Sequence, residues 1–312
     1  MTDMPLPPTP GLLARVIDSD IVYSFRRSKL TLVAASIALV LILAAIFAPV
    51  LAVQNPFDPA QLDLLNSRIS PLWTGEGQAP FLLGTDEQGR DVFSAILYGM
   101  RISLIVGILG VGLAAVIGIG LGLIAGYAGG AVDSLIMRVA DVQLTFPAIL
   151  IALLIDGVVK SLLSNHLDAN TMLAVLVIAI GLSFWVQYAR TVRGSVMVEK
   201  NKDYVAAAQL IGLPARVIML RHVLPNTMGP IFVIATINLA LAIITEATLS
   251  FLGSGMPDTM PSLGTLIRIG NNYLFAGEWW IVAFPGLSLA LLILSMNMLG
   301  DWLRDALNPK LR

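Results

Sequence analysis

Few residues in this sequence have the types and spacings that catalysis or metal binding requires. The chain contains no cysteine, so disulfides and thiolate metal sites are excluded. Its two histidines, His166 and His222, are far apart and are better explained as polar loop or cytoplasmic residues than as metal ligands. The nucleotide-binding motif GxxxxGKS/T does not occur. We therefore expect no catalytic, cofactor or metal site, and any ATP must bind to another chain.

The residue that stands out is Glu246, which lies in an otherwise apolar stretch. A charged side chain is costly in hydrocarbon, so it must face a partner or a watery cavity. Two roles are open: lining a solute pathway near its outer mouth, or making a hydrogen-bonded contact between helices. Asn238 and Asn297 pose a weaker form of the same problem, and we expect interhelical hydrogen bonds to satisfy them.

The composition identifies the environment in which these side chains must lie. The 312 residues are 57% hydrophobic and 12% charged, and the mean hydropathy is +0.84. A soluble domain of this length could not bury so much apolar surface beneath a charged exterior. A net charge of −1 offers no basic face for nucleic acid. The sequence is that of a membrane protein.

A helix needs about 20 mostly apolar residues to cross a bilayer. The first apolar stretch is longer than the core of a typical signal peptide, so we predict a retained span there. The third is interrupted by Arg138, Asp141, Pro147 and Asp156. The six predicted spans are 30–53, 102–125, 135–159, 171–188, 227–252 and 279–299.

Lysine and arginine collect on one side of these spans. Cytoplasmic loops of membrane proteins carry the excess of positive charge, so both termini are predicted in the cytoplasm. The fold predicted is an all-α membrane bundle of six helices. Its segments are an N-terminal tail (1–29), a first helix (30–53), an extracytoplasmic segment (54–101), a five-helix core (102–300) with a cytoplasmic loop (191–225), and a C-terminal tail (301–312).

Two local patterns refine this organisation. Gly118, Gly122, Gly126 and Gly130 recur every four residues, and we interpret them as a stripe for close helix packing rather than a phosphate loop. Thr85 and Gln88 match a capping box, which predicts a short outer helix over 86–98. That helix would either dock a partner on the outer face or position the second span.

The cytoplasmic loop is the most informative segment. A helix capped by Asn201 or Asp203 can run to Ile211, and Gly212 suits the left-handed position that follows. Pro214 then begins a second short helix ending at His222, and Pro225 predicts that the next span starts afresh. The two helices could serve as a lever for another protein or lie on lipid headgroups.

This loop resembles the EAA loop of binding-protein-dependent ABC importer permeases, whose pattern is E-A-A, three residues, G, nine residues, then I-x-L-P. The matching residues are Ala207, Ala208, Gly212, Leu224 and Pro225, whereas Ala206 replaces the glutamate and His222 the isoleucine.

Three further passages resemble the dipeptide/oligopeptide/nickel branch, of the dipeptide permease C type: 83–104, 245–264 and 297–311. Leu263 stands where a Trp is usual and Asn308 where an Asp is usual.

The resemblance implies the type I importer fold and a bacterial inner-membrane location. It implies four kinds of partner: a second permease, two ATPases that hold ATP and Mg, an extracytoplasmic solute-binding protein, and the lipid bilayer. The solute would be a di- or oligopeptide, with nickel or another small solute left open. The residues implied in ATPase coupling are Asp203, Tyr204, Ala207, Ala208, Gly212, Arg221, Leu224 and Pro225.

Two other classes of function would require different residues. A secondary transporter driven by an ion gradient would favour paired charges near the midplane, for which Glu246 and Asp156 are the candidates. An intramembrane enzyme would need a nucleophile, base or metal ligands at depth, and no such cluster appears.

Overall fold

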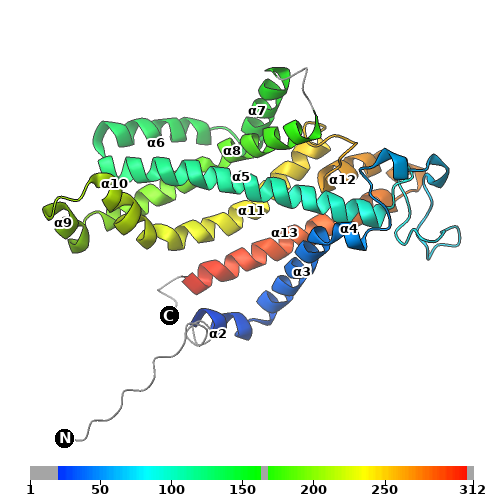
Figure 1. Cartoon of the computed structure of the whole chain (residues 1–312), viewed down its shortest axis with the longest axis horizontal. Helices are drawn as coiled ribbons and strands as arrows, with labels where there is room; N and C mark the ends of the chain where they lie inside the picture. The colour runs from blue at the N-terminus through cyan, green and yellow to red at the C-terminus, as the bar shows by residue number, and fades with distance from the viewer. Residues whose placement is uncertain (1–19, 163–167, 308–312) are drawn as a thin grey trace, which may run out of the picture.

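The computed structural model describes residues 20–162 and 168–307. His166 and Asn308 therefore lie outside the described residues. The described chain is helical, and its extended contact is limited to an isolated bridge between Thr85 and Asp91. Figure 1 shows the long helices running along one axis, with α9 and α10 at one end and the segment between α4 and α5 at the other.

The first elements are α2 (Asp20–Arg27), α3 (Lys29–Ile46) and α4 (Ala48–Leu51). Ser28 begins α3 by accepting a hydrogen bond from the Thr31 N–H at 3.3 Å. The predicted first span is thus a long helix followed by one extra turn. It packs against α13 (Trp280–Leu307), and many of its other side chains are exposed.

Two helices are longer than the stretches predicted for them. α5 (Val92–Ala128) has 37 residues and α8 (Ala169–Glu199) has 31. At 1.5 Å per residue they are about 55 and 46 Å long, against roughly 30 Å of hydrocarbon. Both helices must therefore project beyond the bilayer. The projecting ends contain polar residues, and a prediction from apolar stretches leaves these ends out.

The third predicted span is not one straight helix but two helices that meet at a sharp bend. α6 (Gly130–Leu144) and α7 (Ala148–Leu162) are bent by 94°. Pro147 lies at the break, because it lacks an N–H and keeps its predecessor out of helical geometry. Among the described residues, five helices are long and apolar enough to cross a membrane, or six if the bent pair is one span.

The most extensive helix packing among the described residues joins α5 to α8. A Cβ at Gly118 would lie 2.4 Å from the Trp185 carbonyl oxygen, and one at Gly122 would lie 2.6 Å from the Ala189 oxygen. Gly126 likewise faces Val196. These three glycines form the predicted stripe, but Gly130 does not, because it begins α6 and has open space around it.

The cytoplasmic segment differs from expectation in two ways. α9 (Asp203–Leu210) has Lys202 at its N-cap, with no side-chain cap, so neither predicted capping residue acts. Beyond Gly212, the chain continues through α10 (Ala215–Val217), a π-helical turn η3 (Ile218–Val223) and η4 (Leu224–Thr227) into α11 (Met228–Phe251). Pro225 therefore does not interrupt the path, because the changes in helical pitch accommodate it in the first turn of η4.

The outer end consists of short turns η1 (Pro59–Gln61), η2 (Leu64–Asn66) and η5 (Leu274–Ala276), with α12 (Leu263–Asn271). The predicted capping box is wrong, since Thr85 Oγ1 accepts from the Ile69 N–H at 2.8 Å instead. Helix α5 begins later, where Asp91 accepts from the Ser94 N–H at 2.8 Å. The expected outer helix over 86–98 is thus a loop followed by the start of α5.

Candidate functional site

Helix α9 has two different faces. Val205 and Ala208 are buried against the helix bundle, whereas Ala206, Ala207 and Leu210 are exposed. Leu210 is 89% exposed, and the following Ile211 is 75% exposed. We call Ala206, Ala207, Leu210 and Ile211 the α9 outer face. Such exposed apolar residues, beyond the ends of helices that cross a membrane, are typical of a protein contact surface.

Gly212 ends α9 in a left-handed conformation with φ of 79°. Its N–H donates to the Gln209 carbonyl at 3.0 Å, and the Leu213 N–H donates to the Ala208 carbonyl at 3.1 Å. These two bonds form a Schellman motif, which requires positive φ at Gly212. The predicted conformation of Gly212 is confirmed, and it sets the direction in which the chain leaves α9.

The inner face of α9 is held by polar contacts. Glu199, at the end of α8, accepts hydrogen bonds from Lys202 Nζ and from the Tyr204 hydroxyl, each at 2.7 Å. Asn226 Nδ2 in turn donates to the Tyr204 oxygen at 3.2 Å. Burial alone would raise the pKa of Glu199, but the hydrogen bonds from Lys202 and Tyr204 outweigh it and lower the pKa below its usual value. Glu199 is therefore a carboxylate at neutral pH.

The residues predicted to couple to an ATPase lie together in the segment from α9 to η4. Their exposure divides them into two groups. Asp203, Ala207, Gly212, Arg221 and Pro225 are exposed, whereas Tyr204, Ala208 and Leu224 are half-buried or buried.

Sequence reasoning missed Glu199 and Asn226. Each had only a weak signal in the sequence. Glu199 is an acidic residue at the end of an apolar helix, and Asn226 is an asparagine directly after Pro225.

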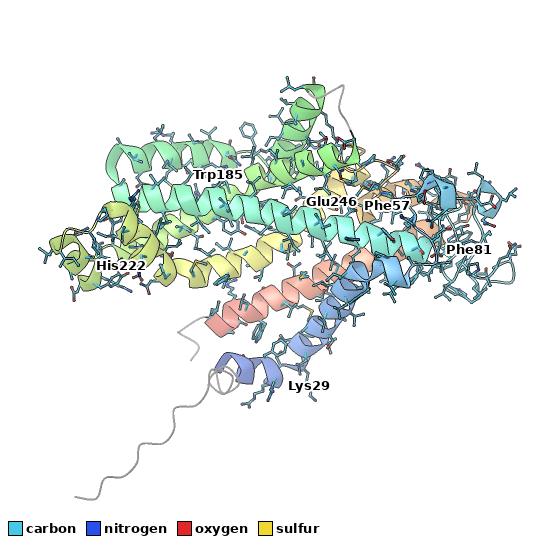
Figure 2. The ribbon with its side chains drawn as sticks, viewed as in Figure 1. Lys29, Phe57, Phe81, Trp185, His222 and Glu246 are labelled. Atoms are coloured by element: carbon cyan, nitrogen blue, oxygen red, sulfur yellow. The ribbon has the colours of Figure 1, made fainter. Side chains whose placement is uncertain are left out.

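Glu246 lies elsewhere, near the outer half of the bundle, well apart from His222 in Figure 2. Its side chain is 0% exposed. Ser103 on α5 and Ser250 on α11 each donate a hydroxyl hydrogen bond to it at 2.7 Å. The Leu263 N–H, in the first turn of α12, reaches the Ser103 oxygen at 3.4 Å. Glu246 itself lies on α11, so its bond to Ser103 joins α11 directly to α5, and Ser103 extends the contact to α12.

The two asparagines differ from each other. Asn238 is fully buried on α11, where its amide lies beside the buried Tyr188 hydroxyl of α8. Asn297 is only half-buried on α13. The structure does not bring either residue together with α9.

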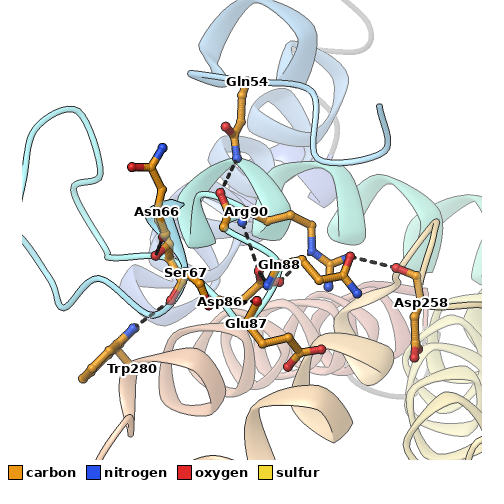
Figure 3. Close-up of polar contacts among 11 residues, drawn as sticks. Gln54, Asn66, Ser67, Asp86, Glu87, Gln88, Arg90, Asp258 and Trp280 are labelled. Carbon is orange, nitrogen blue, oxygen red and sulfur yellow. Dashed lines mark hydrogen bonds and ion pairs between the residues drawn. The ribbon is translucent and has the colours of Figure 1, made fainter. Parts of the chain in front are cut away.

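A buried ion pair holds the outer end together (Figure 3). Arg90 is 0% exposed, and its Nε donates to Asp86 at 2.6 Å. Its NH1 donates to the Asp258 carbonyl at 2.7 Å, and Trp280 Nε1 donates to the Thr85 carbonyl at 3.1 Å. The segment before α5 is thereby fastened to the loop before α12 and to α13.

Asp156, the other charge in an apolar helix, is paired within its own helix. Lys160 Nζ lies 2.9 Å from the Asp156 carboxylate and also donates to the Ser254 carbonyl. Asp156 and Glu246 therefore have separate partners. Within the described ranges, no three His, Cys, Asp or Glu side chains gather as metal ligands.

Comparison with protein families gives two matches. Residues 118–312 match the binding-protein-dependent transport system inner membrane component. Residues 19–71 match the N-terminal transmembrane domain of oligopeptide transport permease C.

Curated relatives extend over nearly the whole chain. The Di/tripeptide transport system permease protein DppC of Pseudomonas aeruginosa is 38% identical over 93% of this chain and 91% of its own. The Oligopeptide transport system permease protein OppC of Bacillus subtilis is 36% identical over 94% and 90%.

Among solved structures, a chain of the MetNI methionine ABC transporter in inward-facing conformations aligns with a TM-score of 0.54. It covers 69% of this chain and 96% of its own at 16% identity, a likeness of fold alone. The predicted resemblance and the predicted helical importer fold are confirmed. The chain belongs to the family of binding-protein-dependent transport system inner membrane components.

Proposed function

We propose that the chain is the permease subunit of an ATP-driven importer for di- or oligopeptides, forming half of the pathway beside a second permease. The observation that carries the proposal is the α9 outer face, which offers Leu210 and Ile211 to a docking partner. The relatives named for di/tripeptide and oligopeptide transport support the choice of solute.

In this proposal the chain does no chemistry itself. Two ATPase subunits bind ATP and Mg, and one of them docks on the α9 outer face in the cytoplasm. An extracytoplasmic solute-binding protein delivers the peptide to the opposite end, where the Arg90 and Asp86 pair holds the outer segment. Both chain termini then lie in the cytoplasm.

Co-purification tests the docking step. The chain is expressed with the second permease and the ATPases, and Leu210→Arg is compared with Leu65→Arg, a matched change at an outer residue that is 91% exposed. A charge in an apolar contact is costly to bury, so we expect Leu210→Arg to lose the ATPases and Leu65→Arg to retain them. Retention in both variants would contradict docking on α9.

Uptake into vesicles tests the energy source and the solute. ATP-dependent accumulation of a labelled dipeptide by the whole complex is the expected result. Uptake by this chain alone, driven by an ion gradient, would show a secondary transporter. Competition by nickel, without competition by unlabelled peptides, would assign the importer to a metal solute.

A further inference from the structure

A chain of hydrogen bonds crosses the base of α9 and links two long helices. Glu199 ends α8, Tyr204 lies in the first turn of α9, and Asn226 lies in η4 just before α11. We infer that these three residues form a mechanical tether, which makes α9 move as one body with α8 and α11. The inference rests on the proposed function, because a tether of this kind matters where a motor protein pushes on α9.

The first argument is geometric. The Tyr204 hydroxyl donates to Glu199 Oε2 at 2.7 Å and accepts from Asn226 Nδ2 at 3.2 Å. The same Asn226 nitrogen donates to the His222 carbonyl at 2.7 Å, within η3. A single tyrosine oxygen therefore connects segments that are 27 residues apart in sequence, Glu199 and Asn226. A charged acceptor makes the bond to Glu199 stronger than one between neutral groups.

The second argument concerns the size of α9. A helix of eight residues is marginal in water, and only Val205 and Ala208 of α9 are buried. These small contacts restrain sliding and rotation weakly. A force applied to the α9 outer face would therefore turn the helix about its flanking turns unless polar bonds held its inner face.

A neighbouring contact brings a third long helix into the same body. Lys200 Nζ, one residue beyond Glu199, donates to the Gly126 carbonyl at 2.8 Å, near the end of α5. Gly126 is packed so closely that a Cβ there would lie 2.8 Å from Val196 Cβ on α8. The inner ends of α5 and α8 are thus fixed to each other where the tether begins.

The tether assigns Tyr204 a role different from that of the α9 outer face. Its hydroxyl points to Glu199 and Asn226 rather than to a docked protein. Glu199, Tyr204 and Asn226 are positioning residues: their removal should leave docking intact and weaken the transmission of movement.

The test compares Tyr204→Phe with Tyr127→Phe in the complete transporter reconstituted in vesicles. Tyr127 lies at the inner end of α5, and its hydroxyl makes no hydrogen bond to another described residue, so Tyr127→Phe removes the same atom without breaking a tether. Radiolabelled alanylalanine is the probe, and the readout is peptide imported per ATP hydrolysed. We expect Tyr204→Phe to lower this ratio about fivefold with normal ATPase co-purification, and Tyr127→Phe to leave it unchanged.

A second readout follows the movement itself. The chain has no native cysteine, so spin labels can be placed at Gln209→Cys on α9 and Phe232→Cys on α11. With the tether intact, we expect one narrow distance distribution throughout the ATP cycle. In Tyr204→Phe the distance distribution should broaden. The double variant Glu199→Gln/Tyr204→Phe should broaden it little more than either single variant does, because both changes break the same contact.

The outcomes separate the two proposals. An unchanged import ratio and an unchanged distance distribution in Tyr204→Phe would overturn the tether while the proposed function stands. A wild-type complex without bound ATPase would overturn the proposed function itself. If Tyr204→Phe lowers the yield of complex, Asn226→Ala removes the exposed end of the tether and is measured in the same way.

Discussion

Glu246 shows how a single carboxylate can be stabilised at membrane depth. Its two serine partners come from α5 and α11, so removing the acceptor leaves both hydroxyls without their bonds. We predict that Glu246→Leu destabilises the complex by about 2–4 kcal/mol and Glu246→Gln by about half as much, because the amide keeps one acceptor oxygen. Thermal unfolding of the purified complex measures both.

The same pair of variants separates the two roles left open for Glu246. A packing residue changes stability first, and uptake falls only in proportion to folded complex. A pathway residue would give the opposite pattern. Glu246→Gln with wild-type stability and a changed preference among peptides would contradict the packing role.

Glu87 predicts a pH dependence at the outer end. Burial, and next the charge of Asp86, raise the pKa of Glu87 above its usual value. The folded state therefore holds this proton more tightly than the unfolded state. Stability is highest where Glu87 is protonated, and it falls as the pH rises from the ordinary glutamate pKa through the raised one.

Glu87→Gln removes this loss of stability at higher pH, because the glutamine amide does not ionise. We predict that the variant is more stable than wild type at neutral pH, and that the advantage disappears as the pH falls to the ordinary glutamate range. Glu76→Gln is the control, since Glu76 is an exposed acid of the same segment. Melting temperatures across this pH range give the comparison; an advantage that grows on acidification would refute it.

At the scale of elements, the turn after α9 depends on one glycine. Gly212 has a φ of 79°, whereas Gly194 lies inside helix α8. At both positions there is room for a side chain, because no neighbouring atom lies within 4 Å of the place that a Cβ would take. Valine at Gly212 should therefore cost about 1–2 kcal/mol in backbone strain alone. We predict that Gly212→Val inserts normally but uncouples ATP hydrolysis from uptake, whereas Gly194→Val does not. Unchanged uptake by Gly212→Val would count against the lever.

The glycine stripe makes a separate prediction for the pair α5 and α8. A Cβ at Gly122 would meet the Ala189 oxygen at 2.6 Å, while Gly120 has nothing within 4 Å. Gly122→Leu should separate the helices and destabilise the protein by about 3 kcal/mol or more, and Gly120→Leu should be tolerated. The yield of folded protein after detergent extraction distinguishes them. Equal yields would show that α5 and α8 do not depend on this close approach.

The elements also show what sequence reasoning could reach. Apolar runs located α3, α5, α8, α11 and α13, because hydrophobicity marks the part of a helix inside lipid. It does not mark where a helix ends in water, so α5 and α8 were predicted too short. The 94° bend between α6 and α7 and the passage through Pro225 depend on tertiary packing that a linear pattern does not contain.

The candidate site was predictable to a similar extent. Gly212 and Glu246 were identifiable because a glycine after a helix and a charge in an apolar run are local signals. The partners Glu199, Asn226 and Ser103 were not, because their roles arise only when separate helices meet.

At the scale of the whole molecule, the proposed function requires the two ends to face different compartments. Lys200, Lys202, Arg216 and Arg221 flank α9 in the sequence, whereas the outer segment carries Asp58, Asp63, Glu76, Asp86, Glu87 and Asp91. Positive charge is retained in the cytoplasm during insertion, so this asymmetry favours α9 inside. ATP is also supplied in the cytoplasm, where, in the proposed function, an ATPase docks on the α9 outer face.

Cysteine labelling tests this arrangement, because the natural sequence contains no cysteine to interfere. Gln209→Cys on α9 and Glu76→Cys in the outer segment replace exposed residues at opposite ends of the molecule. A membrane-impermeant maleimide added to intact spheroplasts should label Glu76→Cys at once and Gln209→Cys only after the membrane is opened. Labelling of Gln209→Cys from outside would place α9 beyond the reach of any cytoplasmic ATPase, and an ATP-driven push on this helix would then be physically impossible.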